Sequence, residues 1–217
     1  MRKTTRAAAA LAAVAAVTTG VTTANADTGA AHDRGHTAAR SASAHDGGYG
    51  YSRVRKGVPD SAARFAVSSP DVRDGGTFPA DAYADSFGCS SGNRQIRLAW
   101  HGAPQGTRSY AVTLYDPDAP TGAGFWHWLT WDIPTTDTAL GGTLPTGAVA
   151  GTNDAGQTGY LGPCPPVGDI AHHYRITVYA LDTPSLDLPA TTPATVTTFT
   201  MSSHVIGYAT LTASARR

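Results

Sequence analysis

The sequence has no glutamate, and all 16 of its acidic residues are aspartates. It is rich instead in glycine and proline, with 24 and 14 copies. Because these residues favour turns and interrupt helices, the composition predicts a fold made mainly of β-strands. Net charge is also lacking, since 16 basic residues balance the 16 acidic ones. A strongly basic surface that binds nucleic acid is therefore not expected.

Apolar runs long enough to cross a membrane are also missing. The run at residues 7–17 is too short to span a bilayer. Its flanks are those of a secretory leader, with basic residues before it, Arg2, Lys3 and Arg6, and a small-x-small site after it, Ala24-Asn25-Ala26. We therefore predict that residues 1–26 are a signal peptide cleaved after Ala26, so that the protein is secreted. An uncleaved anchor is the alternative, and no other transmembrane segment is expected.

Cysteine is scarce, with Cys89 and Cys164 as the two copies. Two cysteines far apart in the sequence are too few for a cysteine-rich zinc site. An even pair in an exported protein usually forms a disulfide, so we expect these two to be joined. The alternative is that Cys164 is a free, buried thiol packed as a small apolar group.

Residues 27–55 consist largely of alanine, glycine, serine, histidine and arginine, without apolar periodicity. They are predicted to be a disordered tail before a folded domain at residues 56–217. The histidines of the tail are irregularly spaced, which favours a solvated linker over a metal site.

Short apolar stretches separated by turn signals fill the predicted domain. Those that read as strands are residues 94–101, 108–116, 125–133 and 174–181. Several short strands of this kind predict a sandwich of antiparallel sheets. Strict alternation along residues 125–133 would place Phe125, His127, Leu129, Trp131 and Ile133 on one face. Both faces of this strand are largely apolar, so we expect it to be central and buried.

Residues 192–206 are ambiguous. Thr192 followed by Pro193 is typical of a helix start. The apolar residues do not repeat cleanly at helical spacing, however, and the many threonines favour a strand. Propensity alone leaves this segment open.

Two segments carry the candidate chemistry. The first is YDPDAPTGAGFWHW, with Asp116 and Asp118 at a strand end and His127 after them. The second is GYLGPCPPVGDIAHHY, in which prolines stiffen a loop that leads to His172 and His173. Taken alone, an Asp-Pro-Asp stretch is more typical of a turn than of a binding site. A histidine on an apolar strand face is likewise more often a hydrogen-bonded core residue than a ligand-binding one. Both blocks together favour a binding site.

These two blocks resemble the signatures of the phosphatidylethanolamine-binding protein family, also called the Raf kinase inhibitor family, in its bacterial branch. The resemblance covers about residues 65–211. It implies a central antiparallel sheet packed on a second, smaller sheet, with one or two short helices. One of these helices falls at residues 192–206, so we expect a short helix there. The resemblance also implies a small anion-binding pocket and no metal or other cofactor.

The resemblance places nine residues in that pocket: Asp116, Asp118, Pro120, His127, Gly162, Pro165, Pro166, His172 and Tyr174. The histidines, the tyrosine hydroxyl and backbone N–H groups near Gly162 are the expected donors to a phosphate. An aspartate is expected to raise the pKa of a pocket histidine, so that it binds as a cation and binding improves as the pH falls. The chain departs from the family at His173, where arginine is usual.

Three functions remain in view. We expect a secreted, non-catalytic protein that binds a small phosphorylated or anionic ligand, such as a phosphoethanolamine-like headgroup. No motif of a nucleophile elbow, a phosphate loop or a zinc protease is present, so an enzyme is not expected. The alternatives are an inhibitor of a secreted hydrolase such as a protease, and a metal-dependent hydrolase that uses Asp116, Asp118, His127 and His172.

Overall fold

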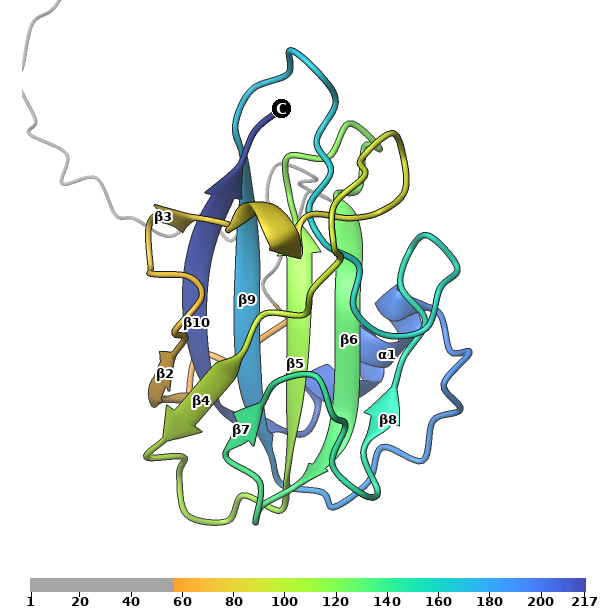
Figure 1. Cartoon of the computed structure of the whole chain (residues 1–217). Helices are drawn as coiled ribbons and strands as arrows, with labels where there is room; N and C mark the ends of the chain where they lie inside the picture. The colour runs from red at the N-terminus through yellow and green to blue at the C-terminus, as the bar shows by residue number, and fades with distance from the viewer. Residues whose placement is uncertain (1–56) are drawn as a thin grey trace, which may run out of the picture. The chain divides into compact units, whose positions relative to one another are not determined.

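A seven-stranded sheet forms the framework of residues 57–217, the part of the chain that the computed structural model describes (Figure 1). Its strands are β1 (Ala63–Arg64), β3 (Gly76–Thr77), β5 (Ser109–Asp116), β6 (Phe125–Pro134), β8 (Val149–Ala150), β9 (His172–Leu181) and β10 (Val205–Ala215). They lie in the order β1–β10–β9–β5–β6–β8, and β3 also pairs with β10. Strands β10, β9, β5, β6 and β8 pair antiparallel, whereas β1 and β3 run parallel to β10. The predicted signal peptide and tail lie outside the described residues.

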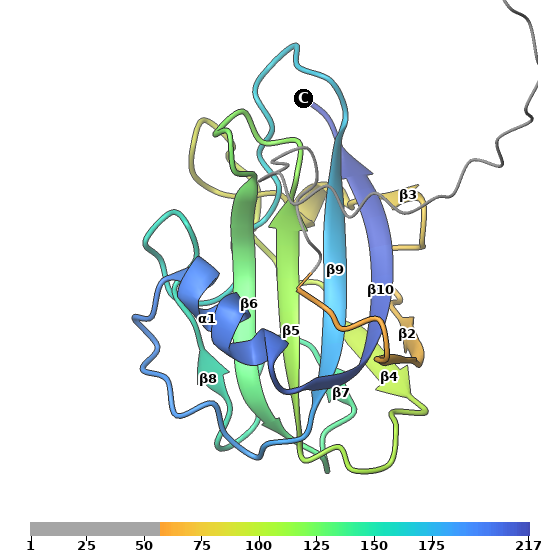
Figure 2. The ribbon, with the colours of Figure 1, turned by 180° about the vertical axis from the view of Figure 1, so that it is seen from behind.

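A smaller sheet covers one face of this framework and a helix covers the other. The small sheet consists of β2 (Ala66–Ser68), β4 (Leu98–His101) and β7 (Ala139–Leu140), in the order β2–β4–β7. The helix α1 (Ala194–Ser202) crosses the opposite face, as the view from behind shows (Figure 2). A 3-10 turn, η1 (Ala80–Ala82), precedes β4. The predicted sandwich of a central antiparallel sheet, a smaller second sheet and a short C-terminal helix is confirmed.

Each face of the large sheet has its own apolar core. Leu114 and Ile176 pack with Trp100 of the small sheet. Ala111 and Leu129 pack with Met201 of α1 on the other side. Within the described residues, no helix is long and apolar enough to cross a bilayer.

The helix expected at residues 192–206 is present but shorter, because β10 begins at Val205. Thr192 does not cap it, since its hydroxyl donates to the carbonyl of Pro189 at 2.7 Å and Pro193 occupies the N-cap position. Inside the helix, the Thr198 hydroxyl donates to the Ala194 carbonyl at 3.0 Å. Back-bonding of this kind lets threonine sit in a helix despite its β propensity.

The strands expected at residues 108–116 and 174–181 are confirmed, and β9 begins two residues early, at His172. The strand expected at residues 94–101 begins only at Leu98. The reason is that the N–H of Arg97 donates to the carboxylate of Asp71 at 2.7 Å, and the Arg97 guanidinium binds the same carboxylate. A side chain therefore takes the backbone donor that a longer strand would have used.

The expected alternation along β6 is wrong at two points. Leu114 of β5 pairs with Trp128, but the next residue, Tyr115, pairs with Trp126. His127 is therefore an extra residue in a β-bulge, which turns two successive side chains to one face. Its ring lies 5.2 Å from that of Tyr174 between centroids, on the same side as Trp128.

A second bulge lies further along β6, where the pairing with β5 is again irregular. It separates Ile133, which packs under the small sheet, from Leu129 and Trp131, which pack under α1. Strand β6 is buried as expected, but it is not central, since only the two-residue β8 lies beyond it. The first bulge is the one that matters for function, because it aims His127 away from the α1 side.

Candidate functional site

A cavity of about 430 Å³ opens where β5 ends and β6 and β9 begin, at the upper end of the sheet in Figure 1. These strand ends meet because β5 runs antiparallel to both neighbours. The cavity is lined by eight of the nine predicted site residues: Asp116, Pro120, His127, Gly162, Pro165, Pro166, His172 and Tyr174. Residues of both sequence blocks therefore line the same cavity.

Asp118 is the predicted residue that does not line the cavity. Its carboxylate accepts the backbone N–H of His173 at 2.7 Å and lies 3.0 Å from Nδ1 of the same ring. Its own N–H donates to the carboxylate of Asp116 at 2.9 Å. Asp118 therefore ties the start of β9 to the end of β5 and holds His173 outside the cavity.

His172 is held between two carboxylates. Its Nδ1 lies 2.7 Å from Oδ2 of Asp116, and its Nε2 lies 3.3 Å from Oδ2 of Asp169. Burial alone would lower the pKa of His172, but the hydrogen bonds to Asp116 and Asp169 outweigh it and raise that pKa. The expected cationic histidine is therefore His172. Both of its ring N–H groups are already donated within the protein, so it is not the free donor that we expected.

His127 has the opposite character. Burial lowers its pKa to about 4, and the charge of Asp116, whose Oδ2 lies 4.0 Å from Nε2, opposes this shift only in part. Its Nδ1 lies 3.2 Å from the carbonyl of Leu161. A carbonyl can only accept, so we assign the proton to Nδ1. The sequence predicted that His127 donates to a phosphate, whereas the neutral ring presents Nε2 as an acceptor.

The hydroxyl of Tyr174 is buried, and no atom of the described residues meets hydrogen-bond geometry with it, although Asp116 and the backbone of Cys164 lie near enough to influence its pKa. Burial, followed by the nearby charge of Asp116, raises its pKa, so the hydroxyl keeps its proton. An unpaired polar group in a protein interior is costly unless a ligand or water satisfies it. Tyr174 also lines the cavity, so a ligand that reaches its buried hydroxyl would gain a hydrogen bond there.

Gly162 plays a packing role. Its N–H donates to the side-chain oxygen of Asn93 at 2.7 Å, so this N–H is not one of the backbone donors expected around Gly162. A Cβ atom at this position would clash with the carbonyl oxygen of Ala82. Only glycine allows the proline-rich wall to approach η1 this closely.

The predicted disulfide between Cys89 and Cys164 is confirmed, with Cα atoms 6.0 Å apart. It joins the loop before β4 to the proline-rich wall of the cavity. Cys89 is buried against Ala84 and Leu161, so the bridge is part of a small apolar cluster. The alternative of a free thiol at Cys164 is wrong.

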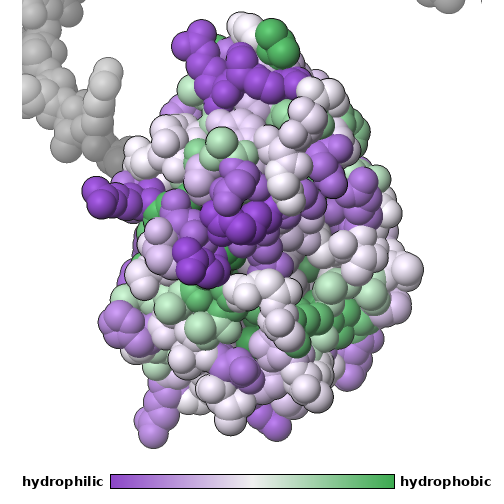
Figure 3. All heavy atoms as spheres, in the orientation of Figure 1, coloured by the Kyte–Doolittle hydropathy of each residue, from purple (hydrophilic) through white to green (hydrophobic). Residues whose placement is uncertain are grey.

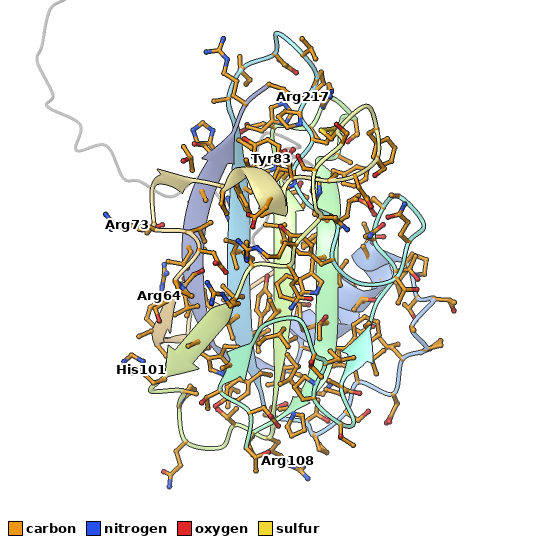
Figure 4. The ribbon with its side chains drawn as sticks, in the orientation of Figure 1. Arg64, Arg73, Tyr83, His101, Arg108 and Arg217 are labelled. Atoms are coloured by element: carbon orange, nitrogen blue, oxygen red, sulfur yellow. A yellow bond between two sulfur atoms is a disulfide. The ribbon has the colours of Figure 1, made fainter. Side chains whose placement is uncertain are left out.

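Several lining residues were missed: Phe87, Ala119, Thr121, Phe125, Leu161, Val167 and Arg217. Most belong to the two sequence blocks and could have been found as neighbours of the named positions. Phe87 and Arg217 come from outside both blocks, and no local pattern marks them. Figure 4 shows Arg217 at the same end of the sheet as the cavity. Strongly hydrophilic residues lie at this end of the face in Figure 3, beside an isolated hydrophobic one.

The set considered as metal ligands does not converge. Asp118 is directed to His173, and both nitrogens of His172 face carboxylates. Within the described range, no group of three or more histidine, cysteine or acidic side chains is arranged to hold a metal ion.

Residues 68–216 match the family model described as phosphatidylethanolamine-binding protein. The chain belongs to this family. The matched range includes all nine predicted site residues and both cysteines. The family assignment made from the two sequence blocks is thus confirmed.

Relatives and solved structures agree with this assignment. UPF0098 protein YbcL of Escherichia coli is 42% identical over 159 residues, which cover 70% of this chain and 87% of YbcL. The crystal structure of E. coli YbcL, described as a member of the mammalian family, superposes with a TM-score of 0.69 and covers 71% of this chain and 99% of that one, at 40% identity. UPF0098 protein YbhB of E. coli is 36% identical over 67% of this chain and 96% of its own length.

A further relative is named a putative lipoprotein, LppC of Mycobacterium tuberculosis. It is 36% identical over 57% of this chain and 58% of its own length. That name concerns LppC itself.

Proposed function

We propose that this member of the phosphatidylethanolamine-binding protein family is a secreted, non-catalytic protein that binds a small phosphate-containing ligand in the cavity. A phosphoethanolamine-like headgroup is the preferred candidate. The observation that carries the proposal is the buried, unpaired hydroxyl of Tyr174 in the cavity wall. A bound phosphate oxygen would accept its hydrogen bond and remove the cost of leaving it unsatisfied.

The remaining polar groups define what else the ligand carries. Nε2 of His127 and the carboxylate of Asp116 are acceptors on the inner wall, so the ligand needs a donor there. A phosphomonoester with one proton supplies a P–OH group, and ethanolamine supplies an ammonium group. A fully deprotonated anion would meet acceptors only. The site therefore suits a protonated phosphate or a zwitterion better than a bare anion.

The absence of an activated nucleophile supports binding without catalysis. Among the lining residues of the described domain, Cys164 is held in the disulfide. The Thr121 hydroxyl donates to the carbonyl of Gly124 and has no general base beside it. Nucleophilic catalysis requires a base within hydrogen-bond reach of the attacking group.

Export is supported by two independent features. The leader at residues 1–26 has the pattern of a secretory signal peptide. The disulfide belongs to an oxidising compartment, where such bonds persist. Regulation of a secreted hydrolase stays a second prediction from the sequence, and a pull-down from culture medium tests it.

Calorimetry with O-phosphoethanolamine tests the proposal. Tyr174→Phe should weaken binding by about 1.5–3 kcal/mol, the usual worth of a hydrogen bond to a charged group. His127→Ala should weaken it by a similar amount. His204→Ala is the matched control, because His204 forms an exposed pair with Asp182 at 2.8 Å and does not line the cavity. Absence of binding to the wild type, or equal affinity in all variants, would reject this site.

A further inference from the structure

Within the described domain, Arg217 lines the cavity, and no lysine or other arginine does. It follows β10 and is brought to the cavity by the pairing of β10 with β9. His173, the other basic group nearby, is turned to Asp118 and does not line the cavity. Arg217 therefore supplies the permanent positive charge of the wall.

The guanidinium of Arg217 is fixed in place. Its Nε donates to the carbonyl of Pro165 at 3.0 Å, and its Nη1 donates to the carbonyl of Gly88. These carbonyls lie next to the two cysteines of the disulfide, so the guanidinium is positioned by the same bridge. Two loops that the disulfide already joins thus hold the charged group, which limits the entropy lost when it binds a ligand.

No acidic side chain neutralises the charge of this guanidinium. Both of its partners are neutral carbonyls, and no side-chain carboxylate of residues 57–217 forms an ion pair with it. No acceptor for Nη2 occurs among the protein atoms of that range. The N–H groups of Nη2 are therefore able to donate to a ligand.

The inner wall has the opposite polarity. Asp116 is 2% exposed and His127 is 6% exposed, and both present acceptors. His172, whose pKa is raised, directs both of its ring nitrogens to Asp116 and Asp169 and offers neither to a ligand. Arg217 is only partly buried. An anion in the cavity is therefore opposed at the inner end and attracted at the end where Arg217 lies.

We infer that Arg217 is the anion-binding residue of this cavity and orients the phosphate. The charged phosphate oxygens face Arg217, where Nη2 donates a charge-assisted hydrogen bond. The P–OH or ammonium donor of the ligand faces His127. This inference rests on the proposed function, because it assigns an orientation to the same ligand. The competing role is structural, with Arg217 acting only as a strap between the loops at Gly88 and Pro165.

Charge removal at Arg217 tests the inference against a neighbour of identical type. Arg217→Gln should weaken O-phosphoethanolamine binding about tenfold or more and flatten its dependence on salt. Arg217→Lys keeps the positive charge but loses the planar set of guanidinium N–H donors. Its affinity for O-phosphoethanolamine should therefore lie between those of Arg217→Gln and the wild type. The control is Arg216→Gln, because Arg216 contacts Tyr83 through its backbone and does not line the cavity. This control should stay within about twofold of the wild type.

A comparison of two ligands separates the anion-binding role from the strap. O-phosphoethanolamine is measured beside its methyl phosphodiester, which carries less negative charge. If Arg217 binds the phosphate, Arg217→Gln weakens the monoester more than the diester. Equal losses for both ligands would show a structural role and overturn the inference. So would an Arg217→Gln variant that binds like the wild type while His127→Ala does not, and this result would leave the proposed function standing. A wild type that binds neither ligand would overturn both.

Discussion

Nδ1 of His172 lies 2.7 Å from Oδ2 of Asp116, and both side chains are buried. Nε2 of His127 lies 4.0 Å from the same oxygen but belongs to a ring that burial keeps neutral. One carboxylate therefore stands between an imidazole whose pKa is raised and one whose pKa is lowered. This difference, which follows from hydrogen bonding on one side and desolvation on the other, gives the cavity its polarity.

Asp116→Asn should lower the pKa of His172, because an amide cannot stabilise the imidazolium as a carboxylate does. The loss of this charged hydrogen bond should also destabilise the fold by about 1–3 kcal/mol. Since the pKa of His172 is raised in the fold, the stabilisation is fully present below the ordinary histidine pKa of about 6.5. It is lost as the pH rises through the folded pKa.

An NMR titration of the His172 ring and urea unfolding at several pH values check this prediction. Asp182→Asn is the matched control, because it breaks the exposed His204–Asp182 pair. That change should cost less than about 1 kcal/mol. An unchanged His172 pKa in Asp116→Asn would show that the buried pair does not set the charge of this ring.

His127 should remain neutral across about pH 5 to 8, with its proton on Nδ1, because burial holds its pKa near 4. The folded pKa is depressed, so the unfolded chain takes up this proton first as the pH falls. His127 therefore costs stability as the pH drops from about 6.5 towards the folded pKa. Nitrogen-15 NMR of the ring reads both the tautomer and the pKa. A ring that titrates near the ordinary histidine value would contradict the acceptor role.

Phosphomonoester binding should strengthen as the pH falls through the second phosphate pKa of about 6. The sequence predicted the same direction through protonated histidines, but burial keeps His127 neutral, so we attribute the trend to the ligand. The monoanion carries the P–OH donor that neutral His127 requires. Calorimetry over this pH range checks the trend. The methyl phosphodiester, which has no such proton, is the control and should show a flatter profile.

Removal of the Cys89–Cys164 bridge should lower both stability and ligand affinity. Closure of a loop with a sequence separation of 75 residues is worth up to about 4.5 kcal/mol in the chain-entropy model. The bridge also braces the proline-rich wall and the carbonyls that hold Arg217, so phosphate binding should weaken. The double variant Cys89→Ala/Cys164→Ala is compared with the wild type by urea unfolding and calorimetry. Two alkyl adducts on native, non-reduced protein would show that the bridge is absent in solution.

Much of the fold could be predicted from the sequence, because two motif blocks carry enough specific residues to indicate a family. Glycine and proline content and the β-branched runs favour the same strands independently. The bulge at His127 could not be predicted, since apolar residues occur on both sides of it and either register buries them. The sequence therefore indicated His127 as a site residue but not the face of the sheet to which its side chain points.

The protonation states and hydrogen bonds of the site residues were harder to predict than which residues line the cavity. Whether a histidine is charged depends on burial and on which atoms reach its nitrogens, and these are properties of the folded state. Arg217 could not be predicted as a site residue, because Gly88 and Pro165 bind it through their backbone carbonyls. Such contacts leave no pattern of side-chain types in the sequence.

A crystal structure of the protein soaked with O-phosphoethanolamine would decide whether this cavity binds the ligand. We expect a phosphate within hydrogen-bond distance of the Tyr174 hydroxyl, with its charged oxygens towards Arg217. An empty cavity, at a ligand concentration that saturates the protein in solution, would contradict the claim that this cavity is the binding site.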